Sequence, residues 1–240
     1  FLDLAGSEHS RMRQLLSVIP AHQLLQQLQT RLPFTVQAPP TDWQHKPVSP
    51  RAPMGIYPQQ QNALCMVAAA SRLGRIDAAQ LNALADLAEH YGDASLRLTP
   101  WQGLLLPNIP EHSADKLLHA LGELGLLIDA QEPLSNLIAC TGSAACAKGL
   151  ADSKADALLL AKRLRASTAR PQVHLSACPR SCAAAHTAPF TLLASSAGHY
   201  QLYQRTPEAA CFGQLQASAM TIDEAGDWFA AHCATGNSDA

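Results

Sequence analysis

Four cysteines in two close pairs constrain this chain more than any other feature of its sequence. Five residues separate Cys140 from Cys146, three separate Cys178 from Cys182, and 31 lie between the two pairs. Small residues fill both intervening segments, so the backbone can approach a bound group closely and donate N–H groups to its sulfurs. The pattern predicts a four-cysteine iron–sulfur site.

Zinc and disulfides are the alternatives for the same residues. Structural zinc sites usually place about two to four residues between paired cysteines, so a gap of five fits poorly. Disulfide frameworks are typical of short secreted chains, whereas this chain has 240 residues and an odd count of seven cysteines. Residues 1–3 open no signal peptide. Cys65, Cys211 and Cys233 are interpreted as buried and inert.

Charge and composition exclude several classes of function. The formal net charge is −2 at pH 7, and 48% of the residues are hydrophobic. No run approaches the roughly 20 apolar residues of a membrane helix, and no basic block suggests nucleic acid. We therefore expect a cytoplasmic protein with neither a membrane nor a nucleic-acid partner. Because no Gly-rich phosphate loop is present, electrons are expected from a separate reductase or ferredoxin.

The first half of the chain divides into two parts. Residues 1–53 carry apolar side chains at helical spacing up to about residue 38, then five prolines, which predicts a helical N-terminal segment and a stiff, Pro-rich linker. Residues 54–130 combine short apolar runs with two helix patterns, one opened by a capping box at Asp77 and one beginning at Ser113. Strands followed by helices indicate an α+β half domain.

The cysteine pairs fall in the third part, residues 131–205. A helix is expected over 152–166 between the pairs, a strand over 173–175 that delivers Cys178, and a hairpin over 190–203. This part is expected to be an α/β cluster domain. Residues 206–240 are interpreted as a C-terminal extension, in which a second capping box at Thr221 opens a helix.

The cysteine segments resemble the cluster-binding signature of the sulfite and nitrite reductase superfamily, and within it they are most similar to precorrin-3B synthase. Three stretches carry the resemblance. Residues 139–152 hold the first cysteine pair, residues 173–182 hold the second, and residues 96–107 are similar to a stretch of the ferredoxin-like half domain. The resemblance runs from about Met54 to about Tyr203.

The resemblance implies an α+β fold, in which a nitrite/sulfite reductase-like half domain precedes a 4Fe–4S domain. The implied cluster ligands are Cys140, Cys146, Cys178 and Cys182. The residues implied to contact a tetrapyrrole are Arg97, Thr99 and Gln102. Arg180, in the second cysteine loop, is a candidate either to face one of its carboxylates or to order the loop backbone. His174 and His186 lie near the cysteine loops and are candidates to tune the cluster or to bind an additional iron. No catalytic residue is assigned.

The implied activity is that of a precorrin-3B synthase-like monooxygenase. It would hydroxylate precorrin-3A with oxygen in cobalamin biosynthesis, using an external electron donor and a cluster that relays electrons. One alternative is a sirohaem-dependent sulfite or nitrite reductase, in which Cys182 resembles the cysteine that bridges the cluster to the sirohaem iron. The other alternative is a non-catalytic iron–sulfur electron-transfer module or fragment.

The chain contains no internal repeat. Members of the superfamily consist of two related halves with the tetrapyrrole between them, so the resemblance implies that this chain holds only the second half domain and the cluster domain. We therefore expect a fragment, a processed chain or a divergent short protein, and reduction of sulfite or nitrite by this chain alone is not expected.

Overall fold

The computed structural model describes residues 1–6, 9, 12–37, 40, 42–44, 53–184, 188–206 and 212–233. The chain forms two compact units, residues 1–48 and residues 49–240. His186 and Cys211 lie outside the described residues, as does most of the Pro-rich stretch expected as a linker. Within the described residues, no helix is long and apolar enough to cross a membrane.

The first unit consists of short helices, as the apolar spacing predicts. These are α1 (Leu2–Ala5), α2 (Met12–Leu15) and α3 (Ala21–Gln29). Pro20 stands at the N-cap of α3, where its fixed φ suits the approach to a helix and its missing N–H costs no hydrogen bond. Leu15 is fully buried, whereas α3 contributes no buried residue.

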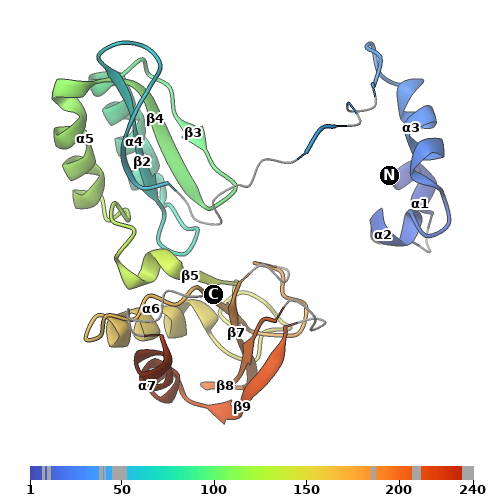
Figure 1. Cartoon of the computed structure of the whole chain (residues 1–240), viewed down its shortest axis with the longest axis vertical. Coiled ribbons are helices and arrows are strands. Elements are labelled where there is room, and N and C mark those ends of the chain that lie inside the picture. Colours follow the sequence, from blue (N-terminus) through green and yellow to red (C-terminus); the bar gives the residue numbers. More distant parts are fainter. Residues whose placement is uncertain are drawn as a thin grey trace. The chain divides into compact units, whose positions relative to one another are not determined.

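The second unit begins with a four-stranded antiparallel sheet in the order β1-β2-β4-β3 (Figure 1). Its elements in chain order are β1 (Gly55–Pro58), β2 (Leu64–Ala70), α4 (Ala78–Tyr91), β3 (Arg97–Leu98), β4 (Gly103–Pro110) and α5 (Glu111–Glu123). The Asp77 capping box forms as predicted, and α5 begins at Glu111, two residues earlier than expected. The α+β reading of this region is confirmed.

One face of this sheet is covered by both helices. Val67 of β2 and Leu106 of β4 share a core with Leu84 of α4 and with Leu117 and Leu121 of α5. All five side chains are fully buried. Because successive strand residues face opposite sides, the residues between these core positions lie on the face away from the helices.

The rest of the second unit is built on a five-stranded mixed sheet, in the order β5-β6-β7-β8-β9. After the 3₁₀ turn η1 (Pro133–Asn136), its elements are β5 (Leu137–Ala139), α6 (Ser153–Leu164), β6 (Val173–Ser176), β7 (Phe190–Ser196), β8 (His199–Gln204), β9 (Gln214–Met220) and α7 (Ile222–His232). The first three strands run parallel, and the β7–β8–β9 part is antiparallel. The expected helix, strand and hairpin of this region are all present.

The boundary expected after residue 205 does not separate two cores. The strand β9 pairs with β8 in the same sheet, and Phe229 of α7 is fully buried in the same core as Leu160 of α6. The aromatic ring of Phe229 lies 5.3 Å from that of Phe190 in β7, edge to face. Residues 212–233 are therefore an integral layer of the cysteine-bearing domain, since their apolar side chains complete its core.

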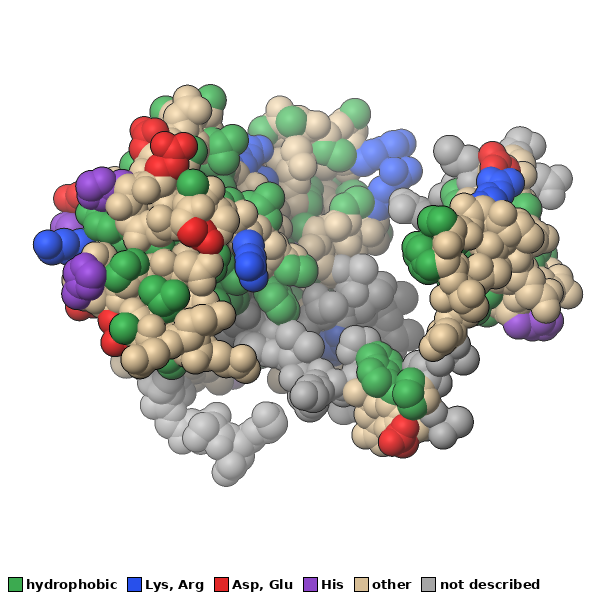
Figure 2. Space-filling model, turned by 90° about the horizontal axis from the view of Figure 1, so that it is seen from above, with side chains coloured by type: hydrophobic (Ala, Val, Ile, Leu, Met, Phe, Trp, Pro, Cys, Tyr) green, Lys and Arg blue, Asp and Glu red, His purple; other side chains and the backbone are tan. Residues whose placement is uncertain are grey.

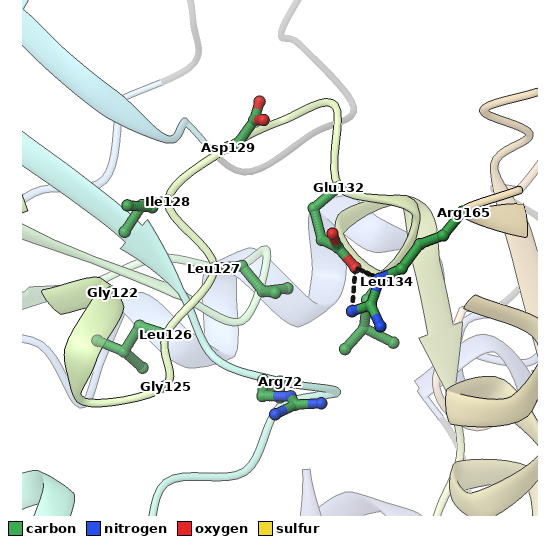
Figure 3. A pocket seen from close by; sticks show the side chains of 10 residues that line it. All are labelled: Arg72, Gly122, Gly125, Leu126, Leu127, Ile128, Asp129, Glu132, Leu134 and Arg165. Atoms are coloured by element: carbon green, nitrogen blue, oxygen red, sulfur yellow. Dashed lines mark hydrogen bonds and ion pairs between the residues drawn. The ribbon is translucent and has the colours of Figure 1, made fainter. Parts of the chain in front are cut away.

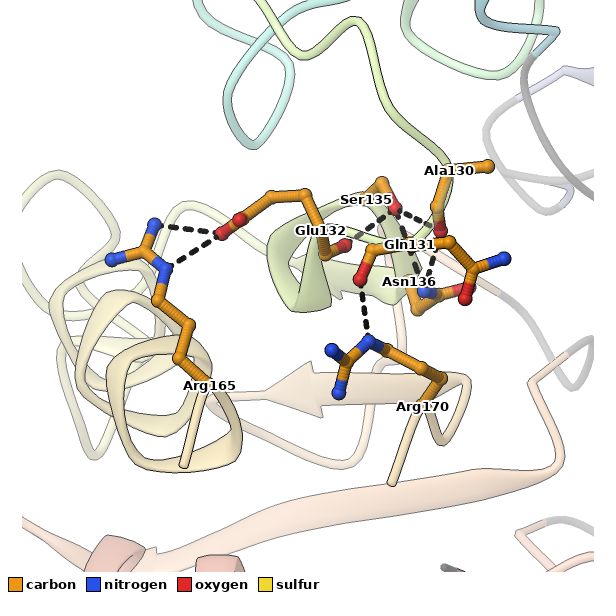
Figure 4. A network of polar contacts seen from close by, with 7 residues as sticks. All are labelled: Ala130, Gln131, Glu132, Ser135, Asn136, Arg165 and Arg170. Atoms are coloured by element: carbon orange, nitrogen blue, oxygen red, sulfur yellow. Dashed lines mark hydrogen bonds and ion pairs between the residues drawn. The ribbon is translucent and has the colours of Figure 1, made fainter. Parts of the chain in front are cut away.

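A short segment joins the two sheets and is held by ion pairs and backbone contacts. Arg165, just after α6, donates from Nη2 and Nε to the Glu132 carboxylate at 2.7 and 3.0 Å, and Arg170 donates to the Gln131 carbonyl (Figure 4). The Glu132–Arg165 pair also lines a pocket of about 390 Å³ whose opposite side includes Arg72 and Leu126 (Figure 3). The segment thereby fixes the start of β5.

Charges are dispersed on the face of the molecule drawn in Figure 2. Lys and Arg side chains occur singly or in small groups between acidic, apolar and polar side chains, and they form no continuous basic patch there.

Replacing Phe229 with Ala should destabilise the whole second unit, because it empties a fully buried aromatic site in a shared core. We expect a loss of roughly 3–5 kcal/mol in the free energy of unfolding, measured by urea denaturation. The control is Leu215→Ala on β9, whose side chain is 45% exposed and should change stability by less than about 0.5 kcal/mol. Equal effects of the two substitutions would contradict the shared core.

Candidate functional site

Adjacent parallel strands bring the two cysteine pairs to one edge of the second sheet. Cys140 directly follows β5, and Cys178 lies two residues beyond β6. The strands pair in parallel, with Ala139 opposite Leu175, and the Cys140 N–H donates to the Leu175 carbonyl at 3.2 Å. Because carboxyl ends of neighbouring parallel strands meet at the same edge, Cys140 and Cys178 leave the sheet side by side.

Backbone hydrogen bonds draw the second cysteine of each pair towards the same edge. The Gly149 N–H donates to the Cys146 carbonyl at 2.9 Å, and the next residue, Leu150, donates to the Ala177 carbonyl at 2.9 Å. The first cysteine loop is thus tied to the residue that precedes Cys178. The second loop forms a turn, because the Ser181 N–H donates to the Cys178 carbonyl at 3.4 Å.

Two glycines let the first cysteine loop pack closely on itself and on the start of α6. A Cβ on Gly142 would lie 2.7 Å from the Ser153 nitrogen, and Gly142 has a φ of +73°, which side chains rarely tolerate. A Cβ on Gly149 would lie 2.7 Å from the Ser143 nitrogen. The small residues noted in the sequence therefore have a definite steric role, because the backbone itself packs around the cysteines.

The four thiols differ in exposure and partners. Cys140, Cys146 and Cys178 are partly buried, Cys182 is exposed, and none of them is in a disulfide. Cys140 Sγ accepts a hydrogen bond from the Ala177 N–H at 3.2 Å and lies 3.3 Å from the Ser153 hydroxyl. Backbone N–H groups that point at sulfur are the second-layer partners that cysteine-ligated clusters use.

Two side chains of α6 tie the cysteine edge to its surroundings. Lys154 Nζ donates to the Leu73 carbonyl of the half domain and to the Ala139 carbonyl at 3.2 Å. Burial, and next the Arg75 guanidinium, lower the pKa of Lys154. Asp156 accepts a 2.6 Å hydrogen bond from the buried Tyr200 hydroxyl, and burial followed by this bond raises the pKa of Tyr200.

The donor chemistry of this edge fits a cysteine-ligated cluster. Four free thiols lie on two loops that contact each other. A backbone N–H points at the Sγ of Cys140, and two glycines let the first loop pack closely. Over the described part of the chain, no group of three or more His, Cys, Asp or Glu side chains is placed to hold a metal ion. A single ion requires ligands that converge on one point, whereas each thiolate of a four-iron cube binds its own iron.

Arg97 lies on the open face of the first sheet. It pairs with Leu105, whose neighbours Leu104 and Leu106 belong to the helix-side core, so alternation directs Arg97 away from the helices. The side chain is exposed, and among the described residues it has no hydrogen-bond or ion-pair partner. An unpaired exposed guanidinium of this kind is free to bind an anionic ligand.

Thr99 and Gln102 form the turn between β3 and β4. Thr99 exchanges two hydrogen bonds with Gly103, and its Oγ1 accepts at 3.1 Å while its hydroxyl hydrogen stays available to donate. The Gln102 carbonyl accepts from Ser71 N and Oγ at 3.0 and 2.7 Å, and its side chain packs over Gly74. Gln102 therefore has a structural role that sequence reasoning missed.

The remaining predicted residues lie on or near the second cysteine loop. Arg180 is exposed between Cys178 and Cys182. His174 is fully buried within β6. The structure thus brings Cys140 and Cys178 to one edge of the second sheet, with Cys146, Cys182 and Arg180 in the loops that follow. It carries Arg97, Thr99 and Gln102 on the β3–β4 hairpin of the first sheet.

Comparison with known proteins gives a consistent family. Residues 57–124 match the nitrite/sulfite reductase ferredoxin-like half domain. The chain is 33% identical over 182 residues to a chloroplastic ferredoxin–nitrite reductase of Zea mays, covering 73% of this chain and 32% of that protein. It is also 33% identical over 131 residues to sulfite reductase (ferredoxin) 1 of Mycolicibacterium paratuberculosis, covering 51% of this chain and 24% of the relative.

A solved structure supports the same fold. The Mycobacterium tuberculosis NirA protein superposes with a TM-score of 0.68 at 25% identity, covering 94% of this chain and 46% of that chain. These similarities support the nitrite/sulfite reductase superfamily, with a ferredoxin-like half domain, for this chain. They do not show the finer assignment to precorrin-3B synthase. The chain spans about a third or less of the length of the curated relatives it matches.

Replacing Gly142 with Ala should disrupt the first cysteine loop. The added methyl meets the Ser153 backbone, so we expect iron bound after reconstitution to fall by more than half, with a lower melting temperature. Gly198→Ala is the matched control, because Gly198 also has a positive φ of +68° but nothing lies within 4 Å of its Cβ position. If Gly198→Ala lost as much iron as Gly142→Ala, backbone strain alone would explain the loss.

Proposed function

We propose that this chain is the cluster- and tetrapyrrole-binding half of a sirohaem-dependent nitrite or sulfite reductase. The observation that carries the proposal is the convergence of two cysteine-bearing loops at the adjacent carboxyl ends of β5 and β6. The half-domain match over residues 57–124 and the nitrite and sulfite reductase relatives support the same function. Because the chain spans only part of those relatives, the complete activity is assigned to the whole protein.

The cysteines have distinct roles in this proposal. Cys140, Cys146 and Cys178 are the partly buried thiolates that hold a 4Fe–4S cluster against the protein. Cys182 is exposed and is followed by small residues, so it leaves one edge of the cluster accessible to a second group. When bound there, sirohaem supplies the iron at which the anion is reduced.

Cations and donors of the chain serve to hold a polycarboxylate macrocycle. Arg97 is exposed and unpaired among the described residues, so its guanidinium can bind a carboxylate in a bidentate manner. Thr99 retains a hydroxyl hydrogen for a further bond, and Arg180 extends from the second cysteine loop. Arg97 thus places positive charge on the first sheet, and Arg180 places it in the loop that follows β6 of the second.

The electron donor is proposed to be a ferredoxin. The relatives carry ferredoxin in their names as the partner of nitrite or sulfite reductase. A one-electron protein donor suits a chain in which no nucleotide-binding loop is visible, because a cluster accepts single electrons. Precorrin-3A would be the ligand in the alternative activity, so the relative affinities for the two tetrapyrroles distinguish the two functions.

Cysteine ligation predicts coupled losses of iron and stability. Cys178→Ala should lower iron to well below half of the wild-type content and reduce the melting temperature of the anaerobically reconstituted protein, because cluster binding contributes folding free energy. Cys233→Ala provides the control, since Cys233 lies at the end of α7 away from the cysteine loops in the chain. A stable, iron-replete Cys178→Ala protein would refute the proposed ligand.

Tetrapyrrole binding predicts a role for Arg97. Titrating sirohaem into the cluster-loaded chain should give sharp absorption bands at long wavelength, and Arg97→Ala should weaken binding roughly tenfold, as expected for a charge-assisted contact. Lys116→Ala, which removes an exposed cation on α5, should leave affinity unchanged. Binding of precorrin-3A in preference to sirohaem would favour the monooxygenase, and equal affinities of wild type and Arg97→Ala would remove Arg97 from the site.

A further inference from the structure

One buried hydroxyl group, that of Ser153, lies beside Cys140. Ser153, the first residue of α6, is fully buried, and its Oγ lies 3.0 Å from the Cys140 carbonyl oxygen and 3.3 Å from Cys140 Sγ. The Ala177 N–H already donates to the same sulfur at 3.2 Å. Ser153 therefore contacts both acceptors of a single cysteine.

A hydroxyl has only one hydrogen to share between these two acceptors. In the free thiol, Cys140 can donate its own hydrogen to Ser153 Oγ while Ser153 donates to the Cys140 carbonyl. A thiolate bound to iron has no hydrogen, so that arrangement would turn an oxygen lone pair towards a negatively charged sulfur. Donation to the sulfur instead forms a charge-assisted bond, which strengthens as the sulfur becomes more negative.

We propose that Ser153 tunes the reduction potential of the cluster by donating its hydroxyl hydrogen to Cys140 Sγ. This inference rests on the proposed cluster ligation and adds a residue to it. Reduction adds one electron from an external donor to the cluster, and part of that charge resides on the cysteine sulfurs. The Ser153 hydrogen remains on Oγ and stabilises this charge, so it raises the potential without proton transfer.

The chain offers a closely matched comparison in Ser176. Ser176 is also buried, and its Oγ donates to the Cys178 carbonyl at 2.8 Å. Like Ser153, it bonds the main chain of a proposed ligand, but among the described residues it has no contact with a cysteine sulfur. Comparing the two serines separates an effect of the hydroxyl on sulfur from an effect on the loop backbone.

The test is the midpoint potential of the cluster in the reconstituted 240-residue chain. Samples are poised with dithionite and redox mediators and read by electron paramagnetic resonance, alongside iron per chain. Ser153→Ala should shift the reduced-to-oxidised ratio about tenfold towards the oxidised form at fixed potential, which is about 59 mV for one electron. Ser153→Thr, which keeps the hydroxyl, and Ser176→Ala should both stay within about twofold of wild type.

Several results would overturn the inference. A Ser153→Ala potential equal to that of the wild type would do so, as would an equal shift in Ser176→Ala. If Ser153→Ala retains no iron, the wild-type protein is exchanged into D₂O and measured instead. Electron–nuclear double resonance should then detect a hydroxyl deuteron coupled to the reduced cluster, in addition to the amide deuteron. Absence of the hydroxyl deuteron would refute the assignment. A wild-type chain that binds no cluster would refute the ligation as well, which distinguishes the two failures.

Discussion

The parallel pairing of β5 with β6 is the interaction on which the rest of the site depends. Three residue pairs, from Leu137 opposite Val173 to Ala139 opposite Leu175, set the register of the two strands where they leave the sheet. A slip of one residue would reverse the direction of every side chain in the strand. Cys140 would then lose its position beside the Ala177 N–H.

Core packing and hydrogen bonds stabilise that register. Burial of Val173 and Leu175 in a core shared with α6 and α7 opposes slippage, because a strand shifted by one residue would place the polar side chains of its neighbours in that apolar core. The Tyr200–Asp156 hydrogen bond fixes α6 to β8, and Lys154 fixes it to the half domain through the Leu73 carbonyl. The geometry of the cysteine edge therefore depends on the packing of the whole second unit.

Local sequence signals were sufficient for much of this architecture. Capping boxes at Asp77 and Thr221 predicted helix starts, because side-chain and backbone groups within four residues define them. The spacing within each cysteine pair is also a local signal, and the proposed ligands rest on it. The role of β9 was not predictable in this way: Gln214–Met220 is mostly exposed and shows no buried apolar face, and it forms a strand because β8 offers an edge to pair with. The contacts of Ser153 with Cys140 and of Gln102 with Ser71 join residues that are separated in sequence, so no local pattern predicts them.

The βαβ arrangement also has a consequence for assembly of the protein during synthesis. All four proposed ligands lie within 43 consecutive residues, from Cys140 to Cys182, and one helix separates the two strands that carry them. Units with such local contacts form early, since little loop-closure entropy opposes them. During synthesis all four proposed ligands are made before β7 to α7, and those later elements then close the core behind a site whose connectivity is already complete.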